Sequence, residues 1–399
     1  MRLMASPELI VVVSAVRTPI GRFMGGLSTL AAPDLGRAAV AGALEAAKVP
    51  ADAIDVLYFG QGRQAGSKPN PARQVSWGAG IPEEATSMTV NMACASGMKS
   101  IQLAADDLLL GRATYAVAGG MESMSRVPFM LDRMRDGYRL GDGKVVDLMY
   151  RDGFLCPLSD QLMGATAETL AEEGSISREA QDAFALESQR KAAEAWAAGR
   201  FDDEIISITV PNRRGDILID RDEHMRPQTT IEGLAKLPTV FRAEGGTVTP
   251  GNASGITDGA SALVLTTARE AERAGLEPLA VLVDSQTAGT DPARMGLGPI
   301  PATLPLLERN GLTLDDFGLI ELNEAFAAQA MACLQELPIE AERLNVNGGA
   351  IALGHPIGNT GSRIVVTLLH EMKRRKEKRG LATLCVSGGL GMTTAWQLP

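Results

Sequence analysis

The sequence is poor in aromatic residues, histidine and cysteine. Aromatic residues make up only 4% of the 399 residues, and the chain has three histidines and four cysteines. With so few aromatic side chains, the cores must be built from Ala, Val, Leu, Ile and Met. Four cysteines in a chain of this length do not form a disulfide framework, so we expect a reducing, cytoplasmic environment.

Several functional signatures are also missing. There is no CxxC pair and no HExxH, so nothing in the sequence indicates a metal site. The formal net charge is −10 at pH 7, whereas nucleic-acid binding needs a basic surface. The apolar run 9–13 is too short for a signal-peptide core or a membrane span, and no other stretch is longer. We therefore expect no metal, no nucleic-acid partner and no membrane partner.

Short apolar runs of strand length alternate with amphipathic stretches of helical length. We expect strands at 9–16, 56–60, 114–120, 261–267, 279–285, 319–323 and 381–389. The helical stretches include 35–48, 98–110, 177–199 and 362–378. Apolar strands that alternate with helices predict an α/β fold with buried sheets.

An internal repeat divides the chain into two halves. VNMACASG is followed by a helical stretch and the strand-like TYAVAGGMESM, and VNGGAIALGHPIGNTG is followed likewise by TLCVSGGLGMT. Two related halves would bring equivalent loops together at one interface. We expect an N-terminal half over 1–270 and a C-terminal half over 271–399. The charged, Met-rich segment of about 121–248 is interpreted as a looser insertion into the first half.

Cys94 is the first candidate for chemistry. It lies among small residues at a turn between an apolar strand and a helical stretch. A thiol at a helix N-terminus meets free backbone N–H groups and the positive end of the helix dipole, which favour the thiolate and lower its pKa. The alternative, a small buried hydrophobic residue, is the common role of a lone cysteine.

His355 and Cys385 lie in the glycine-rich segments of the second half. His355 sits in GGAIALGHPIGNTG, where repeated glycines allow close backbone approach, and no GKS or GKT follows as a P-loop requires. An acid–base histidine facing a ligand is the interpretation that we favour there. Cys385 ends an apolar strand just before Ser387 and two glycines, at the place that corresponds to the end of 114–120.

Polar residues near other strand ends and in the insertion are weaker candidates. In NEAFA, Asn323 is either a helix cap or an amide that orients a water, and Glu324 is a possible anion at a helix N-terminus. GNASGITDGAS has Ala where a hydrolase GxSxG elbow has Ser, which leaves backbone contact with a ligand. Four arginines of the insertion could hold a phosphorylated ligand or lie in a solvated loop: Arg213, Arg214, Arg221 and Arg226.

The ordered motifs resemble those of the thiolase family across about residues 9–398. The resemblance is carried by VNMACASG, GNASGITDGAS, NEAFA, GGAIALGHPIGNTG and CVSGGLG, and also by SAVRTPIGRF, NPARQ and GGMESMS. It implies a thiolase fold: two similar α/β halves in an α-β-α-β-α core with an inserted loop domain. It further implies Claisen condensation of acyl-CoA with acetyl-CoA, or the reverse thiolysis of 3-ketoacyl-CoA, in a homodimer or homotetramer.

The resemblance also implies a role for each site residue. Cys94 is expected to be the acylated nucleophile, His355 its base and an oxyanion-hole donor together with a water bound by Asn323, and Cys385 the second acid–base group. The backbone N–H groups of Cys94 and Ser387 are expected to form the other oxyanion hole. Met163 corresponds to a residue near the acyl group, and Arg226 and Ser254 to contacts with coenzyme A. Coenzyme A is then a substrate or product, and no permanently bound cofactor is expected.

The sequence departs from the family pattern at four positions that bear on chain length and coenzyme A contacts. These are Leu162, Gly233, Pro250 and Ser387. Within the family, short-chain acetoacetyl-CoA thiolase and broad 3-ketoacyl-CoA thiolase both remain open. Outside it we considered a decarboxylating ketoacyl synthase, which pairs Cys with two His or with His and Asn, and a non-catalytic acyl-CoA- or lipid-binding relative. The presence of Cys385, Cys94 and His355 favours the thiolase interpretation.

Overall fold

The computed structural model describes residues 8–399, and a mixed sheet of ten strands forms its centre. The strand order is β14-β15-β16-β13-β1-β12-β5-β3-β4, with β2 paired to β12. The strands are β1 (Ile10–Arg17), β2 (Gly21–Arg22), β3 (Val56–Gly60), β4 (Thr86–Val90), β5 (Tyr115–Ser123), β12 (Thr257–Thr267), β13 (Ala280–Gly289), β14 (Leu319–Leu322), β15 (Arg379–Val386) and β16 (Leu390–Gln397). All seven predicted strands are therefore present.

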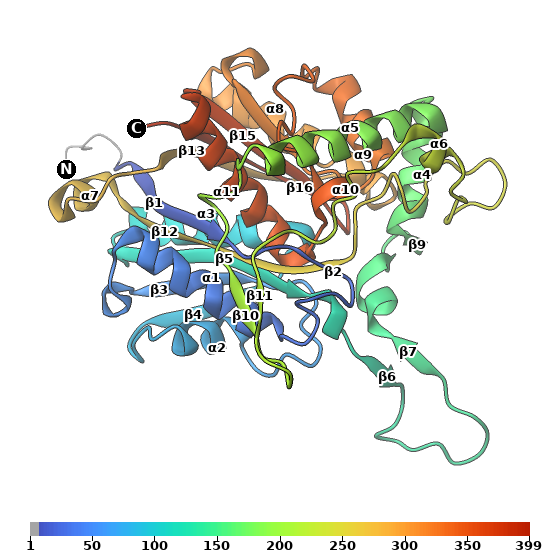
Figure 1. Cartoon of the computed structure of the whole chain (residues 1–399), viewed down its shortest axis with the longest axis horizontal. Coiled ribbons are helices and arrows are strands. Elements are labelled where there is room, and N and C mark those ends of the chain that lie inside the picture. The colour runs from blue at the N-terminus through green and yellow to red at the C-terminus, as the bar shows by residue number, and fades with distance from the viewer. Residues whose placement is uncertain (1–7) are drawn as a thin grey trace.

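The two halves of the sheet enclose a central pair of helices. α3 (Ser96–Leu109) and α11 (Ile357–Arg375) pack against each other, and their apolar residues share one core with β5, β12, β15 and β16. α1 (Ala32–Ala47) and α2 (Pro71–Gly78) cover the outer face of the first half, and α8 (Pro299–Asn310) and α9 (Ala327–Glu336) that of the second (Figure 1). The result is an α-β-α-β-α arrangement, as predicted.

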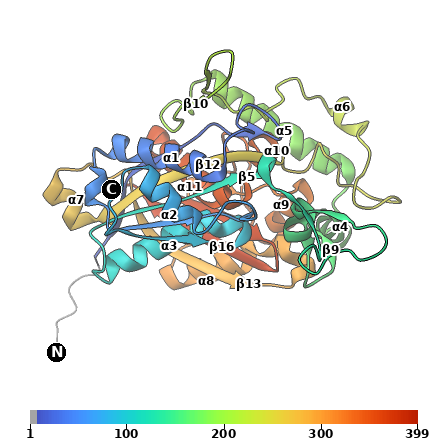
Figure 2. The same ribbon diagram turned by 90° about the horizontal axis from the view of Figure 1, so that it is seen from below.

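The halves are joined at one corner of the sheet. β1 pairs with β12 along its length, and its residues 10–12 pair on the other side with residues 280–282 of β13. α7 (Ala268–Ala274) connects the halves at this corner, at the end of the molecule away from α4 and α9 (Figure 2). The opposite ends of the strands are thereby free to carry the long loops.

Several predicted boundaries differ from the structure, since β5, β12 and β13 are each longer than expected, and two further differences have a clear physical cause. β15 ends at Val386 rather than at 389, because Gly388 and Gly389 have φ of 88° and 82° and turn the chain into β16. α11 begins at Ile357, five residues earlier than expected, and almost its whole first half is buried between the sheet halves. Its length beyond the amphipathic pattern follows from this burial on all sides.

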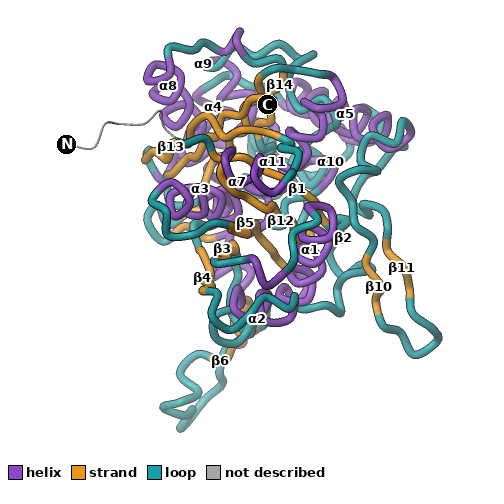
Figure 3. Tube along the Cα trace, turned by 90° about the vertical axis from the view of Figure 1, so that its left-hand side faces the viewer, coloured by secondary structure: helices purple, strands orange, loops and turns teal. Residues whose placement is uncertain are grey.

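The segment between β5 and β12 corresponds to the expected insertion. It contains α4 (Met163–Glu173), α5 (Arg178–Ala197) and α6 (Ile231–Ala235), and the short strands β6 (Phe129–Leu131), β7 (Val145–Asp147), β8 (Leu155–Cys156), β9 (Gln161–Leu162), β10 (Ile208–Val210) and β11 (Ile217–Ile219). The expectation of a looser subdomain holds only for the β6–β7 and β10–β11 hairpins, which project from the body (Figure 3). α4 packs on α9, and α5 packs on α10 (Ala350–Leu353), so these helices belong to the body. The domain boundaries remain predictions.

Within residues 8–399 no helix is both long and apolar enough to cross a membrane.

Candidate active site

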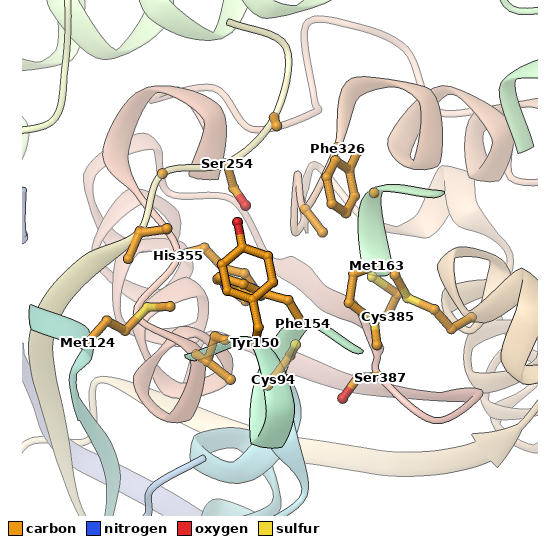
Figure 4. Close-up of a pocket in the computed structure, with 18 of the residues that line it drawn as sticks. Cys94, Met124, Tyr150, Phe154, Met163, Ser254, Phe326, His355, Cys385 and Ser387 are labelled. Carbon is orange, nitrogen blue, oxygen red and sulfur yellow. The ribbon is translucent and has the colours of Figure 1, made fainter. Parts of the chain in front are cut away.

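One cavity brings together six of the eight residues that the sequence pointed to. Cys94, Met163, Ser254, His355, Cys385 and Ser387 all line it, and they come from both halves and from the insertion (Figure 4). Cys94 lies before α3 and His355 before α11, while Cys385 ends β15 and Met163 begins α4. The loops of the two repeats therefore meet, as the internal repeat predicted.

A strained turn presents Cys94 to this cavity. Residues Ala93–Ala95 form one 3₁₀ turn, and α3 starts directly afterwards at Ser96. Ala93 has a φ of 45°, in the left-handed region that residues with a Cβ rarely occupy. The hydroxyl of Ser96 closes the turn, because it accepts from the Met92 N–H at 2.9 Å and donates to the Ala93 carbonyl at 2.6 Å. Cys94 stays half-buried, so its thiol is reachable from the cavity.

The expectation that Cys94 has a lowered pKa was wrong in sign. Burial raises the pKa of the Cys94 thiol, and this effect outweighs the lowering by the Arg63 charge and by hydrogen bonds from the N–H groups of Ser387 and Cys94 itself. The backbone N–H groups at the helix terminus therefore reduce the free-energy cost of forming the Cys94 thiolate, but the thiol stays protonated at neutral pH. A base in the cavity is needed to take the proton.

His355 has the properties of such a base. Its backbone N–H donates to the Gly255 carbonyl at 3.0 Å, and its Nδ1 lies 2.7 Å from Thr360 Oγ1. Burial, with smaller contributions from Arg363 and Arg63, lowers the pKa of His355 to about 3. The imidazole is therefore neutral over the physiological range and free to accept a proton.

Cys385 and Ser387 form the wall opposite His355 (Figure 4). Cys385 is buried in β15, where it pairs with Gly391. Burial, followed by the neighbouring Cys94, raises the pKa of Cys385 well above the ordinary range of a thiol. Cys385 is thus a protonated thiol at rest, and the turn that follows it directs the Ser387 N–H at Cys94.

Asn323 lies next to the cavity and does not line it. It follows β14 and is 1% exposed, yet neither Oδ1 nor Nδ2 of its amide has a partner within the described residues. A buried amide without partners is costly, which favours a bound water over the alternative of a helix cap. The N-cap of α9 is Phe326, so the cap interpretation of Asn323 is wrong.

Glu324 was expected at the N-terminus of the helix that follows NEAFA, which is α9, but its carboxylate binds residues of α5 and α10 instead. Its carboxylate accepts from Ser188 Oγ at 2.6 Å, from the Ile351 N–H at 3.2 Å and from Asn345 Nδ2 at 2.8 Å. It therefore ties the loop after β14 to α5 and to the start of α10, and it does not serve α9.

Only one of the four candidate arginines lies near the cavity. Arg226 lines an adjoining hollow that shares Ser254 and Gly255 with the main cavity. Arg221 stacks over the Trp196 ring at 4.9 Å, and Arg213 and Arg214 lie exposed in the β10–β11 turn. Ser254 thus lines both the main cavity and the hollow that contains Arg226.

Sequence reasoning missed Arg63 and Glu122. Arg63 lines the cavity and is 9% exposed. Glu122, in GGMESMS, accepts from the N–H groups of Gly62 at 2.9 Å, Arg63 at 3.1 Å and Gly358 at 2.8 Å. It joins the loop after β3 to the start of α11. The signal available for Arg63 was a basic residue three positions after the apolar run 56–60.

The remaining walls are apolar and aromatic. They include Met124, Tyr150, Phe154, Phe241, Phe326 and Ile357. Across residues 8–399 no group of three or more His, Cys, Asp or Glu side chains is arranged to hold a metal ion. The arrangement offers two thiols, one neutral imidazole, a pair of backbone N–H donors and a buried guanidinium in an otherwise apolar pocket.

Comparisons with known proteins agree with the fold and with the motifs. Residues 10–269 match the family model described as thiolase, N-terminal domain, and residues 276–397 match thiolase, C-terminal domain. The chain is 47% identical to an acetyl-CoA acetyltransferase of Cupriavidus necator, over 97% of this chain and 98% of that protein. Crystal structures of a Bacillus anthracis acetyl-CoA acetyltransferase and of human mitochondrial 3-ketoacyl-CoA thiolase superpose with a TM-score of 0.96 each. The Bacillus anthracis protein is 42% identical, and the alignment covers 98% of this chain and 98% of that one. The human protein is 40% identical, and the alignment covers 99% of this chain and 100% of that one.

Proposed function

The chain belongs to the thiolase family and is an acyltransferase, and we propose that it catalyses the thiolysis of 3-ketoacyl-CoA, or the reverse Claisen condensation of acyl-CoA with acetyl-CoA, through an acyl-cysteine at Cys94. The observation that carries this proposal is the meeting of Cys94, His355 and Cys385 in one cavity. A nucleophilic thiol beside a neutral imidazole and a second, protonated thiol matches the needs of a two-step acyl transfer.

In the direction of cleavage, the first step forms the acyl-enzyme. His355 takes the proton of Cys94, and the sulfur attacks the 3-keto carbon of the substrate. The bond between C2 and C3 then breaks, and its electron pair leaves with the acetyl-CoA carbanion. Cys385 donates its proton to that carbanion, so acetyl-CoA departs and Cys385 is left as a thiolate. Because its pKa is raised, the Cys385 thiol is a weak acid in the resting enzyme. It therefore gives up its proton only to a strong base, which in this step is the acetyl-CoA carbanion.

The second step returns the enzyme to its starting state. The Cys385 thiolate takes the proton of the incoming coenzyme A thiol, and the resulting thiolate attacks the acyl-Cys94 thioester. Cys94 leaves and recovers its proton from His355. Synthesis of 3-ketoacyl-CoA runs through the same steps in reverse, with Cys385 removing the α-proton of acetyl-CoA.

Each step develops a negative oxygen, and two sets of donors are proposed for them. The N–H groups of Cys94 and Ser387 both point at the Cys94 sulfur, so the oxygen of an acyl group on that sulfur lies within their reach. The negative oxygen of the other step is stabilised by His355 and by a water bound to the amide of Asn323. This amide has no hydrogen-bond partner among the described residues. Fixed donors in a buried site stabilise such charge more than water does.

Ser254 and Arg226 are proposed to contact the coenzyme A portion, and Met163 the acyl end of the thioester. Ser254 stands where the main cavity meets the hollow lined by Arg226. Substrates therefore enter past Ser254, and a short acyl chain is the better fit at Cys94 because Tyr150, Phe154 and Met163 close the walls around it. The relatives named acetyl-CoA acetyltransferase favour the acetoacetyl-CoA type.

We further propose a homodimer or homotetramer that acts in the cytoplasm. The β6–β7 hairpin exposes large apolar side chains, among them Phe129, Met134, Leu140 and Val145, and such a surface is typical of an interface. All four cysteines are free thiols, and two of them must stay reduced for this chemistry. Light scattering of the purified chain measures its oligomeric state.

Thiolysis assays test the proposed function. With coenzyme A, acetoacetyl-CoA is expected to be cleaved with a higher kcat/KM than a long-chain 3-ketoacyl-CoA. A higher value for the long chain would assign the broad 3-ketoacyl-CoA type instead. No cleavage of either substrate by a folded preparation with titratable Cys94 would contradict the proposal itself.

A further inference from the structure

Arg63 is a buried cation whose hydrogen-bonding capacity is largely unused. Its side chain is 9% exposed and lines the catalytic cavity. Nε has no partner, and the one bond of the guanidinium in the described part of the chain runs from Nη1 to the Gly62 carbonyl, at a long 3.4 Å. A buried charge without a partner is expensive, so such a group normally has an anion to bind.

The neighbouring carboxylates do not fill this role. Glu122 lies close enough to interact with Arg63 electrostatically, but its oxygens are engaged by the N–H groups of Gly62, Arg63 and Gly358. Asp152 lines another cavity beside Arg63, and its exposed side chain forms no salt bridge with Arg63. The guanidinium therefore keeps donors available for a ligand.

Arg63 lies in the neighbourhood of the nucleophile, close enough to Cys94 to act on its thiol electrostatically. A Cβ on Gly153 would lie 2.5 Å from Arg63 Nε, which places the guanidinium directly beneath the segment of Phe154. Phe154 packs in one cluster with Cys94, Met124 and Ile357. Ser254 lines this cavity and also the hollow of Arg226, which Arg63 does not line. A thioester that enters past Ser254 and acylates Cys94 thus brings its acyl group into the neighbourhood of Arg63.

We propose that Arg63 forms an anion subsite for the far end of the acyl group, so that among acyl chains longer than acetyl the enzyme prefers short ones that end in a carboxylate. The planar guanidinium pairs with a carboxylate through two parallel hydrogen bonds, which gives geometric selection as well as attraction. The surrounding residues Met124, Phe154 and Ile357 are apolar and provide no competing partner. This inference rests on the proposed thioester chemistry and names the substrate class within it.

Binding measurements test the subsite without depending on turnover. In a Cys94→Ala background, which cannot form the acyl-enzyme, calorimetry is carried out with succinyl-CoA and butyryl-CoA. Both carry four-carbon acyl groups, and they differ in a terminal carboxylate against a methyl group. We expect succinyl-CoA to bind at least about tenfold more tightly, since a charge-assisted pair with a buried cation contributes at this level.

Variants at Arg63 decide the assignment. Arg63→Met is expected to abolish the preference for succinyl-CoA, and Arg63→Lys to keep part of it because the charge remains. Circular dichroism establishes that each variant is folded, and Arg63→Gln replaces Arg63→Met if the latter is not. Arg226→Met is the matched control and should weaken both ligands equally, because it removes a contact with the coenzyme A portion that they share.

Two results would overturn the subsite: equal affinities in the Arg63-containing protein, or a preference unchanged by Arg63→Met, which includes the case in which both ligands lose affinity equally. The ratio of kcat/KM for 3-oxohexanedioyl-CoA over 3-oxohexanoyl-CoA provides a second readout and should exceed about ten. Acetoacetyl-CoA thiolysis separately tests the proposed function, so the failure of one is distinguishable from the failure of the other.

Discussion

Thr360 fixes the tautomer of His355. Thr360 Oγ1 lies 2.7 Å from His355 Nδ1 and also 3.1 Å from the Pro356 carbonyl, to which it donates its proton. With its single proton used there, the hydroxyl accepts from Nδ1–H. Nε2 of the neutral ring is therefore the unprotonated nitrogen, and it is the one available to take the proton of Cys94.

Removing the Thr360 hydroxyl is expected to slow catalysis with little effect on substrate binding. In Thr360→Val the ring loses the partner that selects its tautomer, and kcat for acetoacetyl-CoA thiolysis should fall by about tenfold to a hundredfold, part of the usual worth of a general base. Thr360→Ser keeps the hydroxyl and should restore most of the rate. A wild-type kcat in Thr360→Val, measured by steady-state kinetics, would show that the bond does not orient the base.

The two active-site thiols are expected to be separable by mass spectrometry. Incubation with acetyl-CoA should acetylate Cys94, and Cys385→Ala should still become acetylated while its turnover falls by about 10² to 10⁴, because the second acid–base group is missing. Cys94→Ala should give no adduct. The label is mapped on peptides after digestion, and an acetyl group on Cys385 in the native chain would reverse the assignment.

The raised pKa of Cys94 predicts a characteristic alkylation profile. A thiol whose pKa is raised by burial is mostly protonated at neutral pH, and its thiolate fraction grows about tenfold per pH unit below the pKa. The rate of carbamidomethylation of Cys94 by iodoacetamide should therefore keep rising through pH 8 and 9. A plateau between pH 6 and 8, followed on the Cys94 peptide, would instead indicate a preformed thiolate.

Local patterns in the sequence predicted the α/β class and the candidates Cys94, His355 and Cys385, whereas the layered order of the fold and the cavity residues Met163 and Ser254 were implied by the resemblance to thiolases. The repeat placed the Cys94 loop beside those of His355 and Cys385, and α3 and α11 do pack together in the core. The charge state of Cys94 could not be predicted in this way. A turn before a helix argues for a low pKa, while burial, which depends on segments distant in sequence, decides the opposite sign.

Arg63 and Glu122 illustrate a second limit. Each follows or ends an apolar strand, where a charged residue is usually solvated. Only the tertiary structure covers Arg63 with the segment around Gly153 and brings the Gly358 N–H to Glu122. Likewise, Arg226 carries the same charge as Arg213 and Arg214. Only the tertiary structure brings Arg226 next to the cavity and leaves the other two exposed in a turn.

The water proposed at Asn323 can be tested by removing the amide. Both polar atoms of this side chain are buried without a partner among residues 8–399, so Asn323→Ala should be tolerated by the fold or even stabilise it. The loss of an oxyanion donor is expected to lower kcat by about a hundredfold. Unfolding in urea and steady-state kinetics measure the two effects, and a large loss of stability without loss of kcat would mark Asn323 as a structural residue.

His224 is expected to make the stability of the protein depend on pH in the mildly acidic range. The ring packs against Gly255, where a Cβ would lie 2.2 Å from His224 Cε1. Burial, followed by the charge of Arg226, lowers the pKa of His224 to about 4. Between the ordinary pKa of histidine, near 6.5, and about 4, the unfolded chain binds a proton at this residue that the folded chain does not. Stability from this group is thus complete above pH 6.5 and is lost as the pH falls toward 4.

Comparison with a non-titrating variant isolates this contribution from those of other buried groups. Glu321, whose pKa burial raises to about 8, acts in the opposite direction, so the total slope of the protein does not report on His224 alone. His224→Gln keeps a polar side chain of similar size and removes the proton. Relative to this variant, the native chain should lose about 1.4 kcal/mol of unfolding free energy per pH unit between pH 6 and 4.5. Urea unfolding at a series of pH values measures the difference, and two parallel curves would mean that His224 is protonated in the folded protein as readily as in the unfolded chain.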